Sequence, residues 1–262
     1  NITDMAWIGL LGSKAVAGVG VGGMFTWLSQ GLAAMARMGG QVHVAQCIGR
    51  GDRERAHGFA QAAVQLAAFM GMAYAILSLL FTRQMVGFFQ LADAQAHAAA
   101  MSYTRIACGL IVFSFMTLTL TGLYTAQGDS KTPFIANLVG LATNMVLDPV
   151  LILGVGSFPK LGVVGAAIAT VTAQFVSCVL VLRCLYKSDS SYQLRFSKLM
   201  IKKVYLGQIF QVGIPAGIQS TVINFSNVLL QSSVNSFGSV AMAGYTAANN
   251  IFGFLYASIN AV

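Results

Sequence analysis

The chain has 262 residues, of which 56% are hydrophobic and 8% are charged, and its formal net charge is +8. Because a soluble domain carries roughly 25% charged residues, this composition excludes an ordinary soluble protein. The positive charge does not indicate a nucleic-acid partner, since the basic residues form neither a basic helix nor a patch interleaved with aromatic residues.

Long uncharged windows define the predicted elements. Asp, Glu, Lys and Arg are absent from residues 15–36, 56–82, 106–128, 161–182 and 204–262. A helix needs about 20 apolar residues to cross a bilayer. We therefore predict an all-α polytopic membrane protein in a lipid bilayer. After the end of a first helix at 1–10, its spans lie at about 15 into the forties, 56–82, 98–126, 132–154, 161–186, 205–232 and 240–262.

The first predicted segment carries an acid, Asp4, about 9 Å along the helix axis from Leu10. A carboxylate near the end of a helix commonly lies at the membrane interface. The residues alone favour that interpretation over a functional acid.

The span at 132–154 is almost wholly apolar but contains Asn137, Asn144 and Asp148. Steps of seven and four residues place these side chains within about 40° of one another on a helix. An ionised carboxylate in hydrocarbon costs at least ~3 kcal/mol, so Asp148 is expected to face a bundle interior or a hydrated cavity. Pro149 lacks an N–H and leaves the carbonyl of Met145 without its helical partner, which predicts a kink. A carboxylate, an amide and a loose carbonyl on one face suit a small hard cation such as Na⁺.

The span at 205–232 carries a second predicted kink at Pro215 and a polar stripe after it. The stripe consists of Ser220, Asn224, Asn227 and Gln231, at steps of four, three and four. Such residues supply hydrogen bonds between membrane helices, and they equally form the wall of a polar cavity. Both interpretations stay open on the sequence alone.

The distribution of basic residues predicts the orientation. Ten of them follow the second, fourth and sixth spans (Arg50, Arg53, Arg55, Lys131, Arg183, Lys187, Arg195, Lys198, Lys202, Lys203), and three lie in the alternate loops (Lys14, Arg83, Lys160). Cytoplasmic loops carry the excess of Lys and Arg. Loops 46–57, 127–132 and 187–203 are therefore predicted to be cytoplasmic, in a plasma or inner membrane.

An internal repeat divides the chain. The segment GSKAVAG at 12–18 matches GSVAMAG at 238–244 in five of seven positions, and the polar linker 187–203 lies between them. A six-span unit followed by its own copy is a known plan of secondary transporters. We predict an N-terminal lobe at 1–186, a cytoplasmic linker at 187–203 and the start of a C-terminal lobe at 204–262. The offset implies an intact protein that also has most of a first helix and four further helices.

Several stretches in order resemble the multidrug and toxic compound extrusion (MATE) transporters: TDMAWIGLLGSKAVAGVG, QCIGRGDRERA, TAQGDSKTPFIANLVGLATNMVLDPVLI, LGVVGAAIATVTAQ and VGIPAGIQSTVINFSNVLLQ. The resemblance implies twelve helices in two six-helix lobes around a central cleft, of which this chain holds the N-lobe and two helices of the C-lobe. It also implies a monomer without enzymatic activity that exports organic, often cationic, compounds in exchange for Na⁺ or H⁺, with no other cofactor.

The resemblance also assigns roles to residues. Asp4 matches the carboxylate of the family's first helix, and Asn144 and Asp148 match an Asn-x-x-x-Asp-Pro element of its fifth helix. With Thr170, these residues are expected to form the cation or proton site; no other metal site is expected. The expected substrate cleft includes Asn137, Gln219, Ser220, Asn224, Asn227 and Gln231. One branch of the family carries an acid in its seventh helix, and this chain has none there, which favours the N-lobe site.

Alternatives from other classes are a lipid-linked saccharide flippase of the same superfamily and a non-transporting membrane subunit. A flippase would need a strongly charged cavity for anionic phosphates, and a subunit would not need buried acids. A membrane enzyme would need a constellation such as HExxH, which the sequence lacks.

Overall fold

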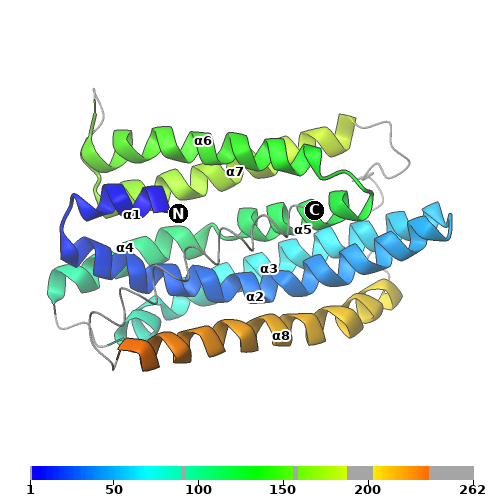
Figure 1. Cartoon of the computed structure of the whole chain (residues 1–262), viewed down its shortest axis with the longest axis horizontal. Helices are drawn as coiled ribbons and strands as arrows, with labels where there is room; N and C mark the ends of the chain where they lie inside the picture. The colour runs from blue at the N-terminus through cyan, green and yellow to red at the C-terminus, as the bar shows by residue number, and fades with distance from the viewer. Residues whose placement is uncertain (1, 90–92, 156–158, 188–202, 236–262) are drawn as a thin grey trace. The chain divides into compact units, whose positions relative to one another are not determined.

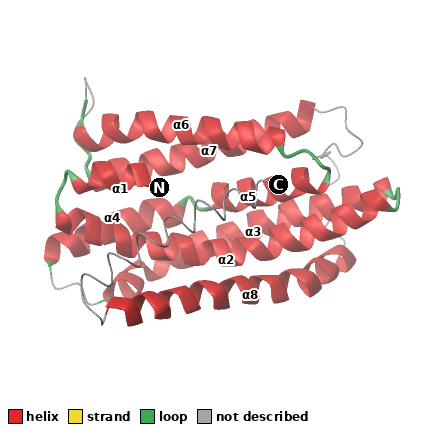
Figure 2. Cartoon of the chain, in the orientation of Figure 1, coloured by secondary structure: helices red, strands yellow, loops and turns green. Residues whose placement is uncertain are grey.

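The computed structural model describes residues 2–89, 93–155, 159–187 and 203–235, without the side chains of residues 2, 3, 5, 224, 225 and 227–235. This part of the chain is built from helices alone (Figure 2). In chain order they are α1 (Ile2–Gly9), α2 (Ser13–Gly49), α3 (Arg53–Gly87), α4 (Ala94–Gly109), α5 (Val112–Ala126), α6 (Lys131–Leu153), α7 (Val163–Lys187) and α8 (Lys203–Asn235). The all-α prediction is confirmed.

The chain divides into two compact units, Asn1–Gly217 and Ile218–Val262. In the first unit α2 packs against α3, α4 and α5, and α6 packs lengthwise against α7 (Figure 1). Of the second unit the described residues form the last turns of α8. The predicted lobe boundary at 187–203 lies almost entirely outside the described residues, as do the repeat copy at 238–244 and the predicted span at 240–262; these stay predictions.

Several of the described helices are apolar and long enough to cross a membrane. The helices α3, α6 and α7 each meet that requirement alone, and α4 with α5 meets it as a bent pair. Large apolar side chains on these helices, such as Phe69, Leu80, Phe134 and Val146, are exposed in the isolated chain. A soluble protein would bury such residues, whereas lipid covers them in a membrane.

One predicted span is broken. The sequence predicts a single helix at 98–126, but the structure ends α4 at Gly109, begins α5 at Val112 and bends the pair by 47°. Gly109 weakens a helix, and the β-branched Ile111 and Val112 that follow also disfavour one. Packing against the neighbouring helix α3 also favours the break. A Cβ atom on Gly71 of α3 would lie 2.9 Å from Val112 Cα, so only glycine lets the start of α5 come this close to α3.

Two Gly-Asp turns close one end of the bundle. Gly51 and Gly128 have φ of 75° and 80°, and the following Asp N–H groups bond back to Cys47 O and Tyr124 O. This is the Schellman pattern of a glycine-terminated helix. The carboxylates then cap the next helices: Asp52 accepts from Arg55 N at 3.1 Å, and Asp129 accepts from Thr132 N at 3.0 Å. Each turn therefore ends one helix and begins the next with two residues.

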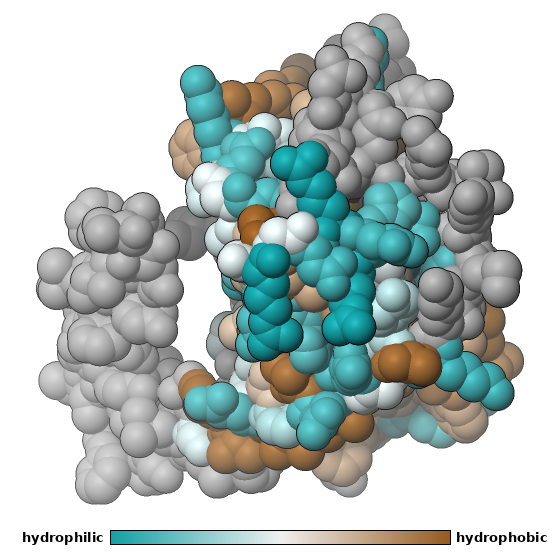
Figure 3. All heavy atoms as spheres, turned by 90° about the vertical axis from the view of Figure 1, so that its right-hand side faces the viewer, coloured by the Kyte–Doolittle hydropathy of each residue, from teal (hydrophilic) through white to brown (hydrophobic). Residues whose placement is uncertain are grey.

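The same end of the bundle carries the exposed basic residues. Arg50, Arg53, Arg55 and Lys131 are exposed at the two Gly-Asp turns. Figure 3 shows hydrophilic residues gathered on this end. The arrangement agrees with the predicted cytoplasmic position of loops 46–57 and 127–132, which stays a prediction because no membrane is present.

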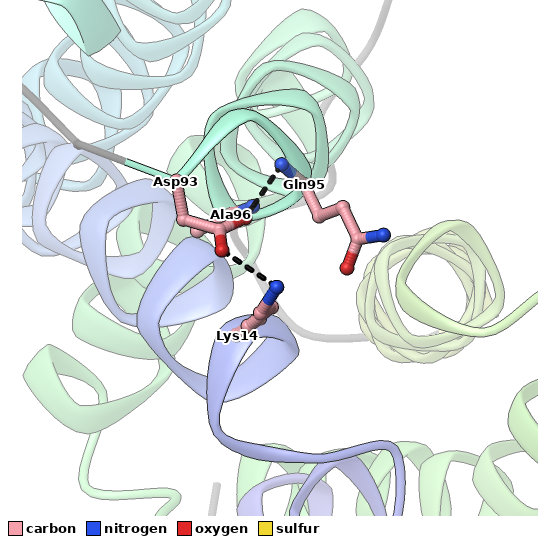
Figure 4. Close-up of polar contacts among 4 residues, drawn as sticks. All are labelled: Lys14, Asp93, Gln95 and Ala96. Carbon is pink, nitrogen blue, oxygen red and sulfur yellow. Dashed lines mark hydrogen bonds and ion pairs between the residues drawn. The ribbon is translucent and has the colours of Figure 1, made fainter.

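The opposite end is tied by an ion pair. Asp93 begins α4 by accepting from Gln95 N at 2.8 Å and Ala96 N at 3.3 Å, and Lys14 at the start of α2 lies 2.7 Å from its other carboxylate oxygen (Figure 4). Lys14 together with these backbone bonds lowers the pKa of the Asp93 carboxyl below its ordinary value. The contact therefore caps α4 and ties it to α2.

Small residues let the helices approach closely. A side chain on Gly140 of α6 would meet Ser177 of α7, whose hydroxyl donates to Ala136 O at 3.2 Å. Similarly, Gly39 of α2 lies against the backbone of Ile209 in the first part of α8. Nearby, the ring of His43 stacks on Phe59 with centroids 4.7 Å apart. Small residues play this role generally where membrane helices pack.

Candidate functional site

Two buried acids meet inside the first unit. Asp4 lies on α1 and is 6% exposed, and Asp148 lies near the end of α6 and is 0% exposed. The two helices pack together, and the two carboxyl groups interact directly. We call Asp4 and Asp148 the acid pair. Neither points toward lipid, so the interfacial interpretation of Asp4 that the residues alone favoured is wrong.

Asn144 orients one member of the pair. It precedes Asp148 by one helical turn, and its Nδ2 donates to Asp148 Oδ1 at 3.2 Å. The side chain of Asn144 is 1% exposed. The predicted common face of Asn144 and Asp148 is therefore present, and it points into the bundle.

Residues from two further helices surround Asp4. Thr170 on α7 donates its hydroxyl to Asp4 Oδ2 at 3.4 Å. The buried Tyr103 on α4 lies beside Thr170 and the acid pair. Its ring has room because Gly22 of α2 carries no side chain: a Cβ there would lie 2.6 Å from Tyr103 Cδ1. Four helices therefore supply the site.

A cavity of about 510 Å³ opens next to the acid pair, and we call it the polar cavity. Its walls come from α1, α2 and α4–α7, and its lining includes Asp4, Trp27, Gln30, Tyr103, Thr117, Thr121, Asn137, Asn144, Thr170 and Gln174. Among all its lining residues the one charged side chain is Asp4. Asp148 does not line the polar cavity itself, but it accepts a hydrogen bond from Asn144, which does.

The structure brings together Asp4, Asn144, Asp148 and Thr170, and it places Asn137 in the wall of the polar cavity. The remaining predicted cleft residues are not tested. Gln219 and Ser220 belong to the second unit, and the side chains of Asn224, Asn227 and Gln231 lie outside the described residues. The helices α6 and α8 continue through Pro149 and Pro215, so that the role of these prolines as kinks stays a prediction.

Sequence reasoning missed two aromatic residues of the site, Trp27 and Tyr103. The signal for Trp27 was its position one residue after Thr26 and three before Gln30, in the uncharged window 15–36, which is otherwise made of small and apolar residues. Tyr103 gave no such signal, because it reaches the site only through the packing of α4 on Gly22.

This arrangement suits a proton or a small hard cation. Two ionised carboxylates in contact and out of water repel one another, and a proton or a cation between them removes that repulsion. Oxygen atoms from Asp4, Asp148, Asn144 and Thr170 are ligands of the kind that Na⁺ accepts. The described residues contain no group of three His, Cys, Asp or Glu side chains for a transition metal.

Comparison with known proteins identifies the family. The family model described as MatE matches residues 1–150. The probable multidrug resistance protein NorM of Thermotoga maritima is 30% identical over 257 residues, which are 96% of this chain and 54% of that protein. The probable multidrug resistance protein YoeA of Bacillus subtilis is 29% identical over 222 residues, or 83% of this chain and 47% of that protein. The chain thus spans about half the length of these relatives.

Solved structures agree with the sequence relatives. A multidrug resistance MATE family transporter of the MOP superfamily in an outward-facing conformation has a TM-score of 0.84 at 25% identity, covering 97% of this chain and 56% of that one. The inward-facing conformation of a multidrug resistance MATE family transporter of the MOP superfamily gives a TM-score of 0.78 at 25% identity, covering 96% of this chain and 56% of that one. The prediction from the sequence motifs is confirmed: the chain belongs to the MATE family of integral membrane transport proteins, which are not enzymes.

Proposed function

We propose that the intact protein is a cation-coupled antiporter, which exports organic and often cationic compounds in exchange for Na⁺ or H⁺ by alternating access. The observation that carries this proposal is the acid pair, buried at 6% and 0% exposure beside a polar cavity. Two curated relatives are described as probable multidrug resistance proteins, which supports the same conclusion.

The acid pair supplies the coupling in this proposal. Binding of one proton or one Na⁺ between the carboxylates of Asp4 and Asp148 lowers their combined negative charge by one, and release of the ion restores it. A ligand shifts a conformational equilibrium only by its difference in affinity for the two states. The ion gradient therefore drives export if the outward-facing and inward-facing states differ in affinity at this pair. Bending at Pro149, one residue after Asp148, is a candidate route by which the change reaches α6.

The polar cavity determines the class of substrate in this proposal. Its volume of about 510 Å³ falls in the range that holds small organic molecules. Its charged lining residue is an acid, and Trp27 and Tyr103 present aromatic rings, which attract cations. The carboxylate of Asp4 would repel an anionic lipid phosphate in this cavity, which disfavours the function of a saccharide flippase.

The test is transport by the full-length protein in proteoliposomes with a Na⁺ or H⁺ gradient imposed separately. Asn fits the space of Asp148 but cannot take up a proton or balance a cation. We expect Asp148→Asn to reduce the rate of gradient-driven dye efflux at least about tenfold. A factor of this size corresponds to the free energy of one charge-assisted hydrogen bond. The matched control is Asp93→Asn, which removes an exposed acid while keeping a capping side chain, and should transport like the wild type.

Normal gradient-driven export by Asp148→Asn would refute the assignment of the acid pair. Export by the wild type without either gradient would refute coupling itself. The proposal also includes a monomeric state and a position in the cell membrane. Loops 46–57, 127–132 and 187–203 lie in the cytoplasm in this proposal, and the ten-to-three distribution of basic residues supports that orientation.

A further inference from the structure

The helices α6 and α7 meet backbone to backbone at Gly140. A Cβ atom on Gly140 of α6 would collide with Ser177 Oγ of α7 and would lie 2.9 Å from Ala173 O. The hydroxyl of Ser177 donates to Ala136 O of α6 at 3.2 Å, and Ser177 is 5% exposed. We call Ala136, Gly140 and Ser177 the α6–α7 clamp. The clamp combines a close approach of two backbones with a buried hydrogen bond between the helices.

The clamp lies on the same row of α6 as the residues of the acid site. The row is buried and consists of residues at steps of four: Ala136, Gly140, Asn144 and Asp148. A step of four residues turns a helix by only about 40°, so such residues form one ridge along it. Gly140 precedes Asn144 by a single turn, about 6 Å along the axis. A displacement of α6 at the clamp therefore reaches Asn144.

The hydroxyl that bonds to Asp4 lies on the same face of α7 as the clamp. Thr170 donates to Asp4 Oδ2 at 3.4 Å and precedes Ser177 by seven residues. Seven residues are about two turns of a helix, so the two side chains leave α7 in nearly the same direction. The clamp therefore fixes Thr170, which bonds to Asp4, relative to Asn144, which bonds to Asp148.

A second close contact between α6 and α7 lies beyond the acid pair. A Cβ atom on Gly165 of α7 would lie 2.6 Å from the carbonyl carbon of Leu151 in α6. While this contact holds, a change at Gly140 tilts α6 away from α7 instead of sliding it. Leu151 lies about 16 Å along the axis from Gly140 and about 10 Å from Asn144. Asn144 therefore moves by about 0.6 of the displacement at Gly140.

We propose that Ser177 is a positioning residue for ion binding: its hydrogen bond to Ala136 O holds α6 on α7, so that Asn144 keeps its bond to Asp148. This inference rests on the proposed coupling through the acid pair and adds a residue that does not touch the ion. Ser177 could instead do no more than stabilise the packing of two helices. The two roles differ in one measurable respect. A positioning residue acts through Asn144, so its effect on ion binding disappears once Asn144 is removed.

Ion binding is measured without substrate, on the full-length protein in lipid nanodiscs. Dicyclohexylcarbodiimide modifies a protonated carboxyl group in an apolar site and spares an ionised one, including one that binds Na⁺. Labelling of Asp148 is followed by mass spectrometry over a series of Na⁺ concentrations and of pH values, which gives a midpoint concentration for each ion. We expect Ser177→Ala to change the midpoint of the ion that drives export at least about threefold, near the lower end of what one hydrogen bond contributes.

The comparison that separates the two roles is a double-mutant cycle with Asn144→Ala. That variant should change the midpoint more than Ser177→Ala does, because it removes the hydrogen bond to Asp148 outright. The double variant should match Asn144→Ala within about twofold, since the two side chains act in one chain of contacts. If the two fold-changes multiply instead, Ser177 acts independently of Asn144 and the inference is overturned.

Two further variants test the geometry. Gly140→Ala adds a methyl group that must move about 0.5 Å from Ala173 O to reach an ordinary contact, which displaces Asn144 by about 0.3 Å. It should change the midpoint at least as much as Ser177→Ala. The matched control is Ser78→Ala, which removes a buried hydroxyl that bonds to a backbone carbonyl at 2.9 Å within α3, outside the walls of the polar cavity. It should leave the midpoint within about twofold of the wild type.

An unchanged midpoint in Ser177→Ala would overturn the inference, whatever the result for Gly140→Ala. An equal change in Ser78→Ala would also overturn it, because the change would then report a loss of stability anywhere in the bundle. If Ser177→Ala does not give a monodisperse protein, Gly140→Ala replaces it in the cycle with Asn144→Ala. Failure of the proposed function looks different, because neither ion gradient would then drive dye efflux by the wild type.

Discussion

Asp93 is an exposed acid at the start of α4, where its carboxyl group can exchange protons with solvent. Its pKa is lowered first by Lys14 and then by the backbone N–H groups of Gln95 and Ala96. A carboxyl group with a depressed folded-state pKa contributes stability above its unfolded pKa, which is about 3.9, and loses it as pH falls through the folded value. The Lys14–Asp93 contact should therefore stabilise the bundle at neutral pH and fail in acid.

We expect Asp93→Asn to lower the thermal unfolding midpoint at pH 7 and to lower it progressively less as the pH falls through the folded-state pKa of Asp93. Asn keeps the cap of α4, so the difference reports the charge. Lys14→Met should reproduce the loss at pH 7, because it removes the largest cause of the shift. The measurement is thermal unfolding of purified protein from pH 3 to pH 7; a difference independent of pH would contradict the role of the ion pair.

The acid pair shows how far single residues could be interpreted before the structure. The spacing of Asn144 and Asp148 predicted one shared face, and their hydrogen bond confirms it. Asp4 was different: local sequence favoured an interfacial position, and only the resemblance to a family placed it in the site. Its burial depends on α1 packing against α6, a contact between residues far apart in the chain.

Among the elements, the two Gly-Asp turns share one dipeptide, in which the glycine ends a helix and the aspartate caps the next. Gly51 and Gly128 adopt positive φ, which costs other residues about 1–2 kcal/mol. The break between α4 and α5 was missed, because Gly109 and the two β-branched residues after it weaken a helix by too little to predict a 47° bend from the sequence. Packing of Gly71 against Val112 favours it from another helix.

We expect Gly128→Ala and Gly51→Ala to destabilise the protein by about 1 kcal/mol or more each, since alanine must adopt the strained conformation. The control is Gly20→Ala in α2, where a Cβ meets nothing within 4 Å. Alanine is the better helix former, so this variant should match or exceed the wild type. Thermal unfolding of the three variants side by side gives the order; equal midpoints would contradict the argument.

For the whole molecule, the orientation of the bundle can be tested with single cysteines. We expect Ser130→Cys, between α5 and α6, to react with a membrane-impermeant thiol reagent only in permeabilised cells. Lys160→Cys, between α6 and α7, should react in intact cells. Both changes are made in full-length protein freed of its native cysteines, which here are Cys47, Cys108, Cys178 and Cys184. Labelling of Ser130→Cys from outside would reverse the predicted orientation.

The membrane environment, the helical class and the ends of most helices follow from the order of residues, because hydropathy, charge and turn chemistry act over a few neighbouring positions. The meeting of Asp4 with Asp148 and the inclusion of Tyr103 do not, because each needs helices distant in sequence to pack together, and Tyr103 also needs the space left by Gly22. Local composition limits which contacts are possible, and packing of the whole bundle selects the ones that form.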